Sequence, residues 1–97
     1  RPGIPTSTSF DGLAPNPFRS NASLVFSLAK QGQVELAIFS VDGRRVRTIA
    51  RETKSAGVYS LAWDGNDDGG RAVNAGVYYA RLVTGQGQFS RSLVYLK

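Results

Sequence analysis

Apolar side chains alternate with other side chains along most of the chain, and this period of two predicts β-strands. In residues 22–30, Leu24, Phe26 and Leu28 occupy one face of the predicted strand. Because successive side chains of a strand point to opposite faces, such a segment buries one face and exposes the other. Further strands are predicted over residues 33–41, 44–50, 58–63, 77–84 and 88–96. No segment from Phe10 onward has apolar residues at helical spacing over three turns, so the predicted fold class is all-β.

Turn-forming segments separate the predicted strands. The first two predicted strands are expected to form a hairpin with its turn at Gln31-Gly32. The last two are expected to form another, with its turn at Gly85-Gln86-Gly87. Asp42-Gly43 suits a type I′ turn, in which both central residues have positive φ, and predicts another hairpin. Residues 64–76 hold four Gly and three Asp and form a long connection. The expected architecture is an immunoglobulin-like antiparallel β-sandwich of about seven strands.

Several residues are expected to have structural roles in this sandwich. Trp63, the only tryptophan, is predicted to fill the space between the two sheets. Pro15 and Pro17 lack backbone N–H donors and are expected to hold the entering strand extended at a sheet edge. Gly76 is expected to let the chain re-enter the sheet after the long connection.

Length and composition limit the chemistry that this chain offers. Its 97 residues fit one domain over residues 10–97, preceded by a linker over residues 1–9 that is rich in Pro, Ser and Thr. The chain has no Cys and no His, which excludes thiol nucleophiles, Ser-His-Asp triads, zinc sites of the usual kind and disulfides. We therefore expect no catalytic residues and a protein that is not an enzyme.

The net charge of +5 raises the question of a polyanionic partner. Arg45, Arg47 and Arg51 are predicted to point to one face of their strand. One interpretation is that these charges keep an exposed edge strand from pairing with another chain. The other is docking to an anionic surface, such as outer-membrane lipopolysaccharide or a secretion receptor. Nucleic acid is not expected as a partner, because no aromatic residues interleave with the arginines.

A candidate calcium loop begins directly after Trp63. Asp64, Asn66 and Asp68 place oxygen side chains at the first, third and fifth positions, and Gly69 follows at the sixth, as at the start of an EF-hand loop. The closing glutamate at the twelfth position is missing. The alternative is a turn capped by its own Asp and Asn side chains. Calcium is the only cofactor that the sequence raises.

The last predicted hairpin carries four aromatic residues, Tyr78, Tyr79, Phe89 and Tyr95. Neighbours Tyr78 and Tyr79 face opposite sides of their strand, so one of them is expected to be exposed. An exposed ring of this kind can stack on a sugar, but a half-exposed tyrosine on a small β-domain is also ordinary. The candidate partner-binding residues are therefore Tyr78, Tyr79 and Tyr95, together with the arginines and Lys97.

Four motifs occur in an order that is similar to a known family. They are Ala-Pro-Asn-Pro-Phe at 14–18, Ser-Val-Asp-Gly-Arg-Arg-Val at 40–46, residues 57–69 with their Trp-Asp-Gly, and Ala-Gly-Val-Tyr-Tyr-Ala-Arg-Leu at 75–82. Together they resemble the FlgD-type immunoglobulin-like domain over about residues 13–97. Domains of this type are also similar to the C-terminal sorting domains of the type IX secretion system, which the basic final residue Lys97 suits. The long Trp-Asp-Gly-Asn-Asp-Asp-Gly segment suits the FlgD-like branch better.

The resemblance implies a non-catalytic C-terminal module of an exported bacterial protein, secreted or at the cell surface. Such a module is expected to act as a secretion sorting signal and cell-surface attachment domain. Its partners would be the secretion machinery or an outer-membrane surface component, and the other domains of the parent polypeptide. The alternatives are a carbohydrate-binding accessory module of a polysaccharide-degrading enzyme, and a structural spacer or flagellar hook-cap-type assembly domain.

Overall fold

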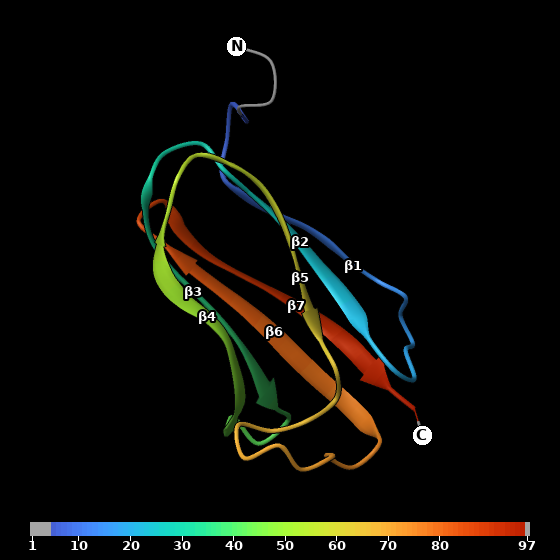
Figure 1. The fold of residues 1–97 in the computed structure, drawn as a ribbon. Helices are drawn as coiled ribbons and strands as arrows, with labels where there is room; N and C mark the ends of the chain where they lie inside the picture. Colours follow the sequence, from blue (N-terminus) through green and yellow to red (C-terminus); the bar gives the residue numbers. More distant parts are fainter. Residues whose placement is uncertain (1–4, 97) are drawn as a thin grey trace.

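The protein is a sandwich of two antiparallel β-sheets, which confirms the predicted all-β class (Figure 1). The computed structural model describes residues 5–96. Its strands are β1 (Ser9–Ala14), β2 (Ala22–Leu28), β3 (Gly32–Ser40), β4 (Arg45–Lys54), β5 (Gly57–Trp63), β6 (Gly76–Thr84) and β7 (Gly87–Tyr95). One sheet has the order β1-β2-β5 and the other the order β4-β3-β6-β7. Within the described part of the chain, no helix is long and apolar enough to cross a membrane.

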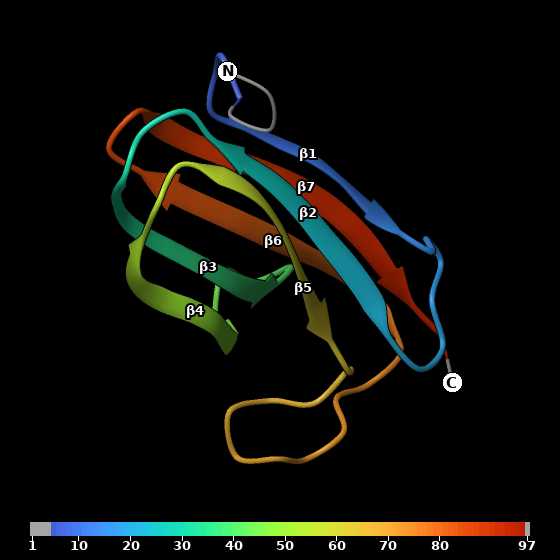
Figure 2. The ribbon, with the colours of Figure 1, turned by 45° about the horizontal axis from the view of Figure 1, so that its top comes forward.

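The core lies between the sheets and is made by the strand faces that the alternation marks as apolar. Leu24, Phe26 and Leu28 of β2 are buried, as are Val34, Leu36 and Ile38 of β3. The two inner faces interdigitate in a layered core, as is usual for aligned sandwiches. Figure 2 shows β2 and β5 lying across the four-stranded sheet.

The expected hairpin between the first two predicted strands is wrong. β2 pairs with β1 and β5, whereas β3 pairs with β4 and β6, so residues 29–31 carry the chain from one sheet to the other. Both strands have a strongly apolar face, and each face is buried by packing against the opposite sheet. The chain therefore gains more burial by crossing the sandwich than by folding back beside β2.

The hairpin between β3 and β4 is present, but its turn is not of type I′. Gly43 N donates to Ser40 O at 3.0 Å, and Ser40 N donates to Arg44 O at 2.9 Å. Gly43 has φ +86°, and no other residue type in residues 5–96 has positive φ, so Asp42 lies outside the left-handed region. This is a three-residue connection that ends on a left-handed glycine. The Ser40 hydroxyl donates to Asp42 Oδ1, and this hydrogen bond lowers the pKa of Asp42.

Pro15 and Pro17 follow β1 instead of lying within it, which corrects their expected role. They flank Asn16, whose Oδ1 accepts a hydrogen bond from Val94 N at 2.9 Å. Phe18, which follows Pro17, donates from its N to Val94 O at 2.9 Å, and its own O accepts from Leu96 N at 2.9 Å. The β1–β2 connection therefore leaves the three-stranded sheet and binds the end of β7. Pro15 and Pro17 suit this connection because they have no backbone N–H that would need an acceptor.

The expected final hairpin is confirmed. β6 and β7 pair along their whole length, from Gly76 opposite Tyr95 to Thr84 opposite Gly87. Gly76, the first residue of β6, has φ +152°, a conformation that residues with a Cβ rarely adopt. The last hairpin thus forms one half of the larger sheet and ends beside the long loop of residues 64–75.

Candidate functional site

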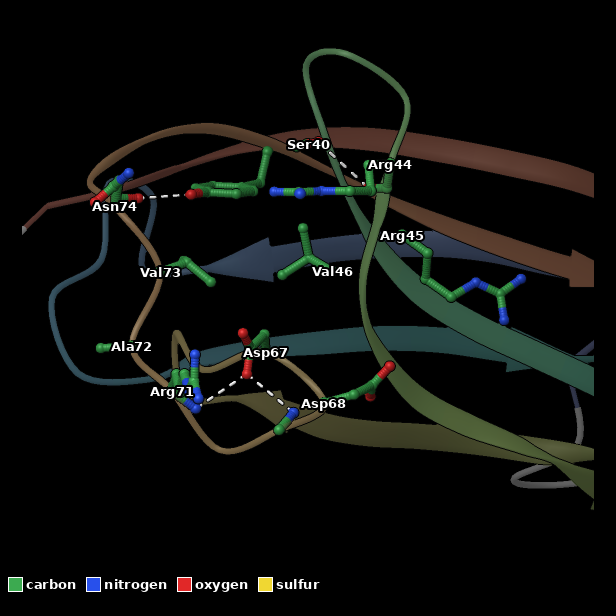
Figure 3. Close-up of a pocket in the computed structure, with 12 residues that line it drawn as sticks. Ser40, Arg44, Arg45, Val46, Asp67, Asp68, Arg71, Ala72, Val73 and Asn74 are labelled. Atoms are coloured by element: carbon green, nitrogen blue, oxygen red, sulfur yellow. Dashed lines mark hydrogen bonds between the residues drawn. The ribbon is translucent and has the colours of Figure 1, made fainter.

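A pocket lies at one end of the sandwich, between the β3–β4 turn and the loop of residues 64–75 (Figure 3). It encloses about 480 Å³. Its lining residues are Ser40, Arg44, Arg45, Val46, Asp67, Asp68, Gly69, Arg71, Ala72, Val73, Asn74 and Tyr78. Figure 3 shows the Arg44 side chain extending across the pocket on the side of Asn74, while Arg45, its neighbour, points away.

The loop is attached to strand β4, which is an edge of the four-stranded sheet. Asp68 N donates to Val46 O at 3.0 Å, and Thr48 N donates to Asp68 Oδ1 at 2.9 Å. Arg47 Nη1 donates to Asp67 O at 3.3 Å. These contacts use backbone groups that an edge strand otherwise leaves open, so the loop protects part of this edge from pairing with another chain.

The carboxylates of the candidate calcium loop are engaged in holding the loop together. Asp64 Oδ1 accepts from Asn66 N at 3.0 Å and also lies 3.7 Å from Arg47 Nη1. Asp68 Oδ1 lies 4.0 Å from Arg47 Nε. A guanidinium thus faces two of the three residues that the spacing proposed as ligands. Within residues 5–96, no group of three His, Cys, Asp or Glu residues is placed to hold a metal ion.

Asp67, which the spacing did not select, caps a turn within this loop. Its Oδ1 accepts from Gly69 N at 2.9 Å and from Arg71 N at 3.0 Å. A side chain that accepts from the backbone two residues on is an Asx turn. The geometry therefore favours the self-capped turn over the calcium loop.

Millimolar calcium is expected to leave the thermal stability of the domain unchanged. An ion that binds only the native state must raise the melting temperature, and Arg47 already supplies positive charge between Asp64 and Asp68. Melting with calcium and with chelator should agree within about 1 °C. A rise of about 4 °C or more that Asp64→Asn removes would contradict the self-capped turn.

Tyr78 and Tyr95, two of the three candidate tyrosines, are core residues, with 8% and 7% of their surface exposed. Tyr78 Oη donates to Asn74 O at 2.6 Å, and burial raises the pKa of its phenol. The Tyr95 ring stacks on Phe18 with ring centroids 5.0 Å apart. Neither ring is open to a sugar or a protein partner. Alternation places Tyr78 and Tyr79 on opposite faces, but only the sheet order shows that Tyr78 faces inward.

Trp63 fills the space between the sheets at this same end. It is completely buried, and its ring lies 5.3 Å from Tyr78 and 5.4 Å from Phe18, measured between centroids. Its Nε1 donates to Asn66 O at 2.8 Å. The tryptophan therefore connects the core to the loop that forms one wall of the pocket.

The arginines of β4 are engaged in different contacts. Arg51 Nη2 lies 2.8 Å and Arg45 Nη1 3.4 Å from Glu35 Oε2, so these two share one carboxylate on the outer face of the sheet. Arg47 turns to the loop instead, which corrects the expected common stripe. The reason is a pair of irregularities in the β3–β4 register, one between Leu36 and Ala37 and one between Ile38 and Phe39. Arg47 pairs with Ile38 between them and therefore faces the other way from Arg45 and Arg51. Lys97 lies outside the described residues.

The outer face also carries residues that the sequence did not single out. Phe39 of β3 lies opposite Tyr79 of β6 and opposite Arg45 of β4. The Arg81 Cζ lies 4.4 Å and the Arg45 Cζ 5.7 Å from the centroid of the Phe39 ring. We call this surface, with Val41 and Val77 at its end, the Phe39–Tyr79 face. In the sequence, Val77, Tyr79 and Arg81 alternate along one strand and so share one of its faces. This indicates a common surface with Phe39 only once β3 and β6 are known to be neighbours.

The fold is shared with solved bacterial proteins. The chain superimposes on part of dimeric latent PorU from Porphyromonas gingivalis with a TM-score of 0.69 and 21% identity, over 88% of this chain and 9% of that one. PorZ is described as an essential bacterial surface component of the type-IX secretion system of Porphyromonas gingivalis. The chain superimposes on it with a TM-score of 0.58 and 15% identity, over 89% of this chain and 11% of that one. FlgD from Xanthomonas campestris, a structure described as giving insights into the hook capping essential for flagellar assembly, superimposes with a TM-score of 0.56 and 24% identity, over 90% of this chain and 64% of that one.

This chain spans about a tenth of PorU and PorZ and less than two thirds of FlgD. No curated protein matches the chain significantly. The sequence pattern of the FlgD Ig-like domain matches residues 18–88, from the segment that binds β7 to the second residue of β7. Because this match covers well over half of the chain and the seven strands form the corresponding sandwich, the chain belongs to the FlgD Ig-like domain family.

Proposed function

We propose that this domain is a non-catalytic module of an exported bacterial protein, serving as secretion sorting signal and cell-surface attachment domain. The observation that carries the proposal is the similarity of its fold to domains of PorU and of PorZ, the latter a surface component of the type-IX secretion system. The partner in this role is the secretion machinery or an outer-membrane surface component. Localisation is at the cell surface or outside the cell.

The chemistry of the pocket supports recognition over catalysis. Tyr78 Oη donates to Asn74 O, and burial raises the pKa of this phenol, which makes it a poorer general base or nucleophile. The Asp67 and Asp68 carboxylates accept backbone N–H groups that hold the loop. These three side chains of the pocket, Asp67, Asp68 and Tyr78, therefore stabilise its walls.

Deletion of residues 10–97 from the gene that carries the domain, in its own host, tests the proposal. We expect the shortened protein to accumulate in the periplasm and to be lost from surface and medium fractions. A matched control replaces the domain with an unrelated β-sandwich of similar size, which keeps the length of the chain and should fail in the same way. Unaltered surface delivery of the deleted protein would contradict the proposal and leave glycan binding or a passive spacer.

Carbohydrate binding is the second candidate function, and Tyr79 is the observation that favours it. Of the three tyrosines that the sequence proposed, Tyr79 alone is substantially exposed, on the outer face of the larger sheet. Retention of the domain on insoluble glycans, lost in Tyr79→Ala and kept in a variant of the other sheet such as Val58→Ala, would support this function over sorting.

A further inference from the structure

Exposed apolar side chains gather at one corner of the larger sheet. Four large hydrophobic residues are well exposed among residues 5–96: Val41 (70%), Val58 (60%), Val77 (43%) and Tyr79 (42%). Val77 and Tyr79 share one face of β6, and Val41 follows β3 two residues after Phe39, the cross-strand partner of Tyr79. Three of the four therefore belong to the Phe39–Tyr79 face. Clustered exposed apolar surface of this kind marks an interaction site more often than scattered single residues do.

The same corner carries positive charge. Arg45 and Arg81 lie over the Phe39 ring from the neighbouring strands. Arg51 lies further along β4, and Glu35 is the carboxylate that Arg45 and Arg51 share. Arg81 has no carboxylate within ion-pair distance among the described residues. Three arginines against one glutamate leave the face positive. It therefore attracts an acidic surface, whereas the same face of a second copy would be repelled by its like charge.

The residue types favour a protein partner over a glycan. The two exposed valines offer curved aliphatic surface, which another protein covers with its own apolar side chains, whereas sugars stack on flat rings. Tyrosine and arginine are the residues that most often carry binding energy at protein interfaces, and lysine is depleted there. All the cations identified on this face are arginines.

The face lies at the end of the sandwich opposite to the end where β1 begins. β1 begins at Ser9, opposite Ser27, beside the end where Leu28 pairs with Gly57. Phe39 and Tyr79 lie toward the other end, where the β3–β4 turn and the start of β6 meet (Figure 1). The chain therefore enters the sandwich at the end away from this corner.

We propose that the Phe39–Tyr79 face docks an acidic protein segment, with the partner's apolar side chains on Val77 and Tyr79 and its carboxylates on Arg81 and Arg45. The inference rests on the proposed function in one respect: the docking face would be the surface through which the domain acts as a sorting signal. The docking is reversible and involves no covalent step. Arg81 is the cation most available to a partner carboxylate, because among the described residues no carboxylate lies within ion-pair distance of it.

Titration of the isotope-labelled 97-residue chain with a glutamate–tyrosine copolymer, followed by NMR chemical shifts, tests the inference. We expect the largest shifts at residues 39–45 and 77–81, and weaker binding at high salt. Tyr79→Ser and Arg81→Glu should each weaken binding at least about tenfold, as expected for central contacts at an interface. The matched controls are Val58→Ser, an exposed valine of the other sheet, and Lys30→Glu, an equal charge change away from this face. Both should stay within about twofold of the unchanged chain.

Three results would overturn the inference. Polygalacturonate binding with the same footprint, at concentrations where the copolymer does not bind, would assign the face to an acidic glycan. Equal weakening by Lys30→Glu and Arg81→Glu would reduce the effect to net charge. Concentration-dependent dimers that Tyr79→Ser abolishes would assign the face to a second copy.

An export assay separates this inference from the proposed function. Export that fails on deletion of the domain but proceeds with Tyr79→Ser and Arg81→Glu would leave the sorting role intact and place its contact elsewhere, against the inference. Copolymer binding at the face combined with normal export of the deleted protein would retain the docking surface and remove the sorting role. Folding of each variant is checked first by the dispersion of its NMR spectrum.

Discussion

Replacement of Trp63 by alanine is expected to lower the free energy of unfolding by about 3–5 kcal/mol. The side chain is completely buried and lies against Phe18, Tyr78 and Tyr95, so its removal leaves a cavity that three rings border. It also leaves Asn66 O without its donor. Because a domain of this size has a total stability of about 5–15 kcal/mol, the variant should be partly unfolded at growth temperature. Urea denaturation followed by circular dichroism measures the change.

The control for this variant is Trp63→Phe, which keeps an aromatic ring in the core and removes the indole N–H. We expect it to cost about 1–3 kcal/mol, less than the alanine variant, because most of the buried volume remains. A Trp63→Ala variant within about 1 kcal/mol of the unchanged chain would show that the end of the sandwich collapses around the cavity.

Substitution of Gly65 by alanine is the second change with a large expected effect, about 2–4 kcal/mol of destabilisation. Gly65 has φ +80°, and an added Cβ would lie 2.8 Å from Tyr95 Cζ. The Tyr95 ring is stacked on Phe18 inside the core, so it has little room to move away. The variant therefore combines backbone strain with a steric conflict against a packed ring.

Gly70→Ala separates these two contributions. Gly70 lies in the same loop with φ +83°, and an added Cβ there meets no atom within 4 Å. Its substitution should cost only the backbone strain, about 1–2 kcal/mol. Equal losses of stability in the two variants, measured by denaturation under the same conditions, would show that the contact with Tyr95 contributes nothing.

Strand positions could be predicted from the sequence because they depend on local alternation. The buried Leu24 and Leu36 follow from period two within their own segments. Whether consecutive strands pair or face each other depends on contacts far apart in the chain, and this is why the expected hairpin between β2 and β3 is wrong. The same limit applies to Tyr78 and Tyr79, since alternation separates them without saying which one faces the second sheet.

The candidate site was predictable only in part, and for related reasons. The outward direction of Arg45 and Arg51 follows from alternation, and both lie on the outer face. The diversion of Arg47 into the loop depends on an irregular register that has no local sequence signal. The oxygen spacing of residues 64–68 is compatible with both an ion and a self-capped turn, and only the positions of Arg47 and of the backbone N–H groups distinguish them.

The attachment of the β1–β2 connection to the end of β7 affects how the domain responds to mechanical force. Phe18 binds Val94 and Leu96, so β7 is held by β6 along its length and by this connection at its end. β1 begins at one end of a molecule 42 Å long, and β7 finishes at the other. A pull between the two ends runs parallel to the strands, while their hydrogen bonds lie across them. These bonds are loaded together in shear and do not unzip one after another, so the domain is expected to resist a pull between its two ends.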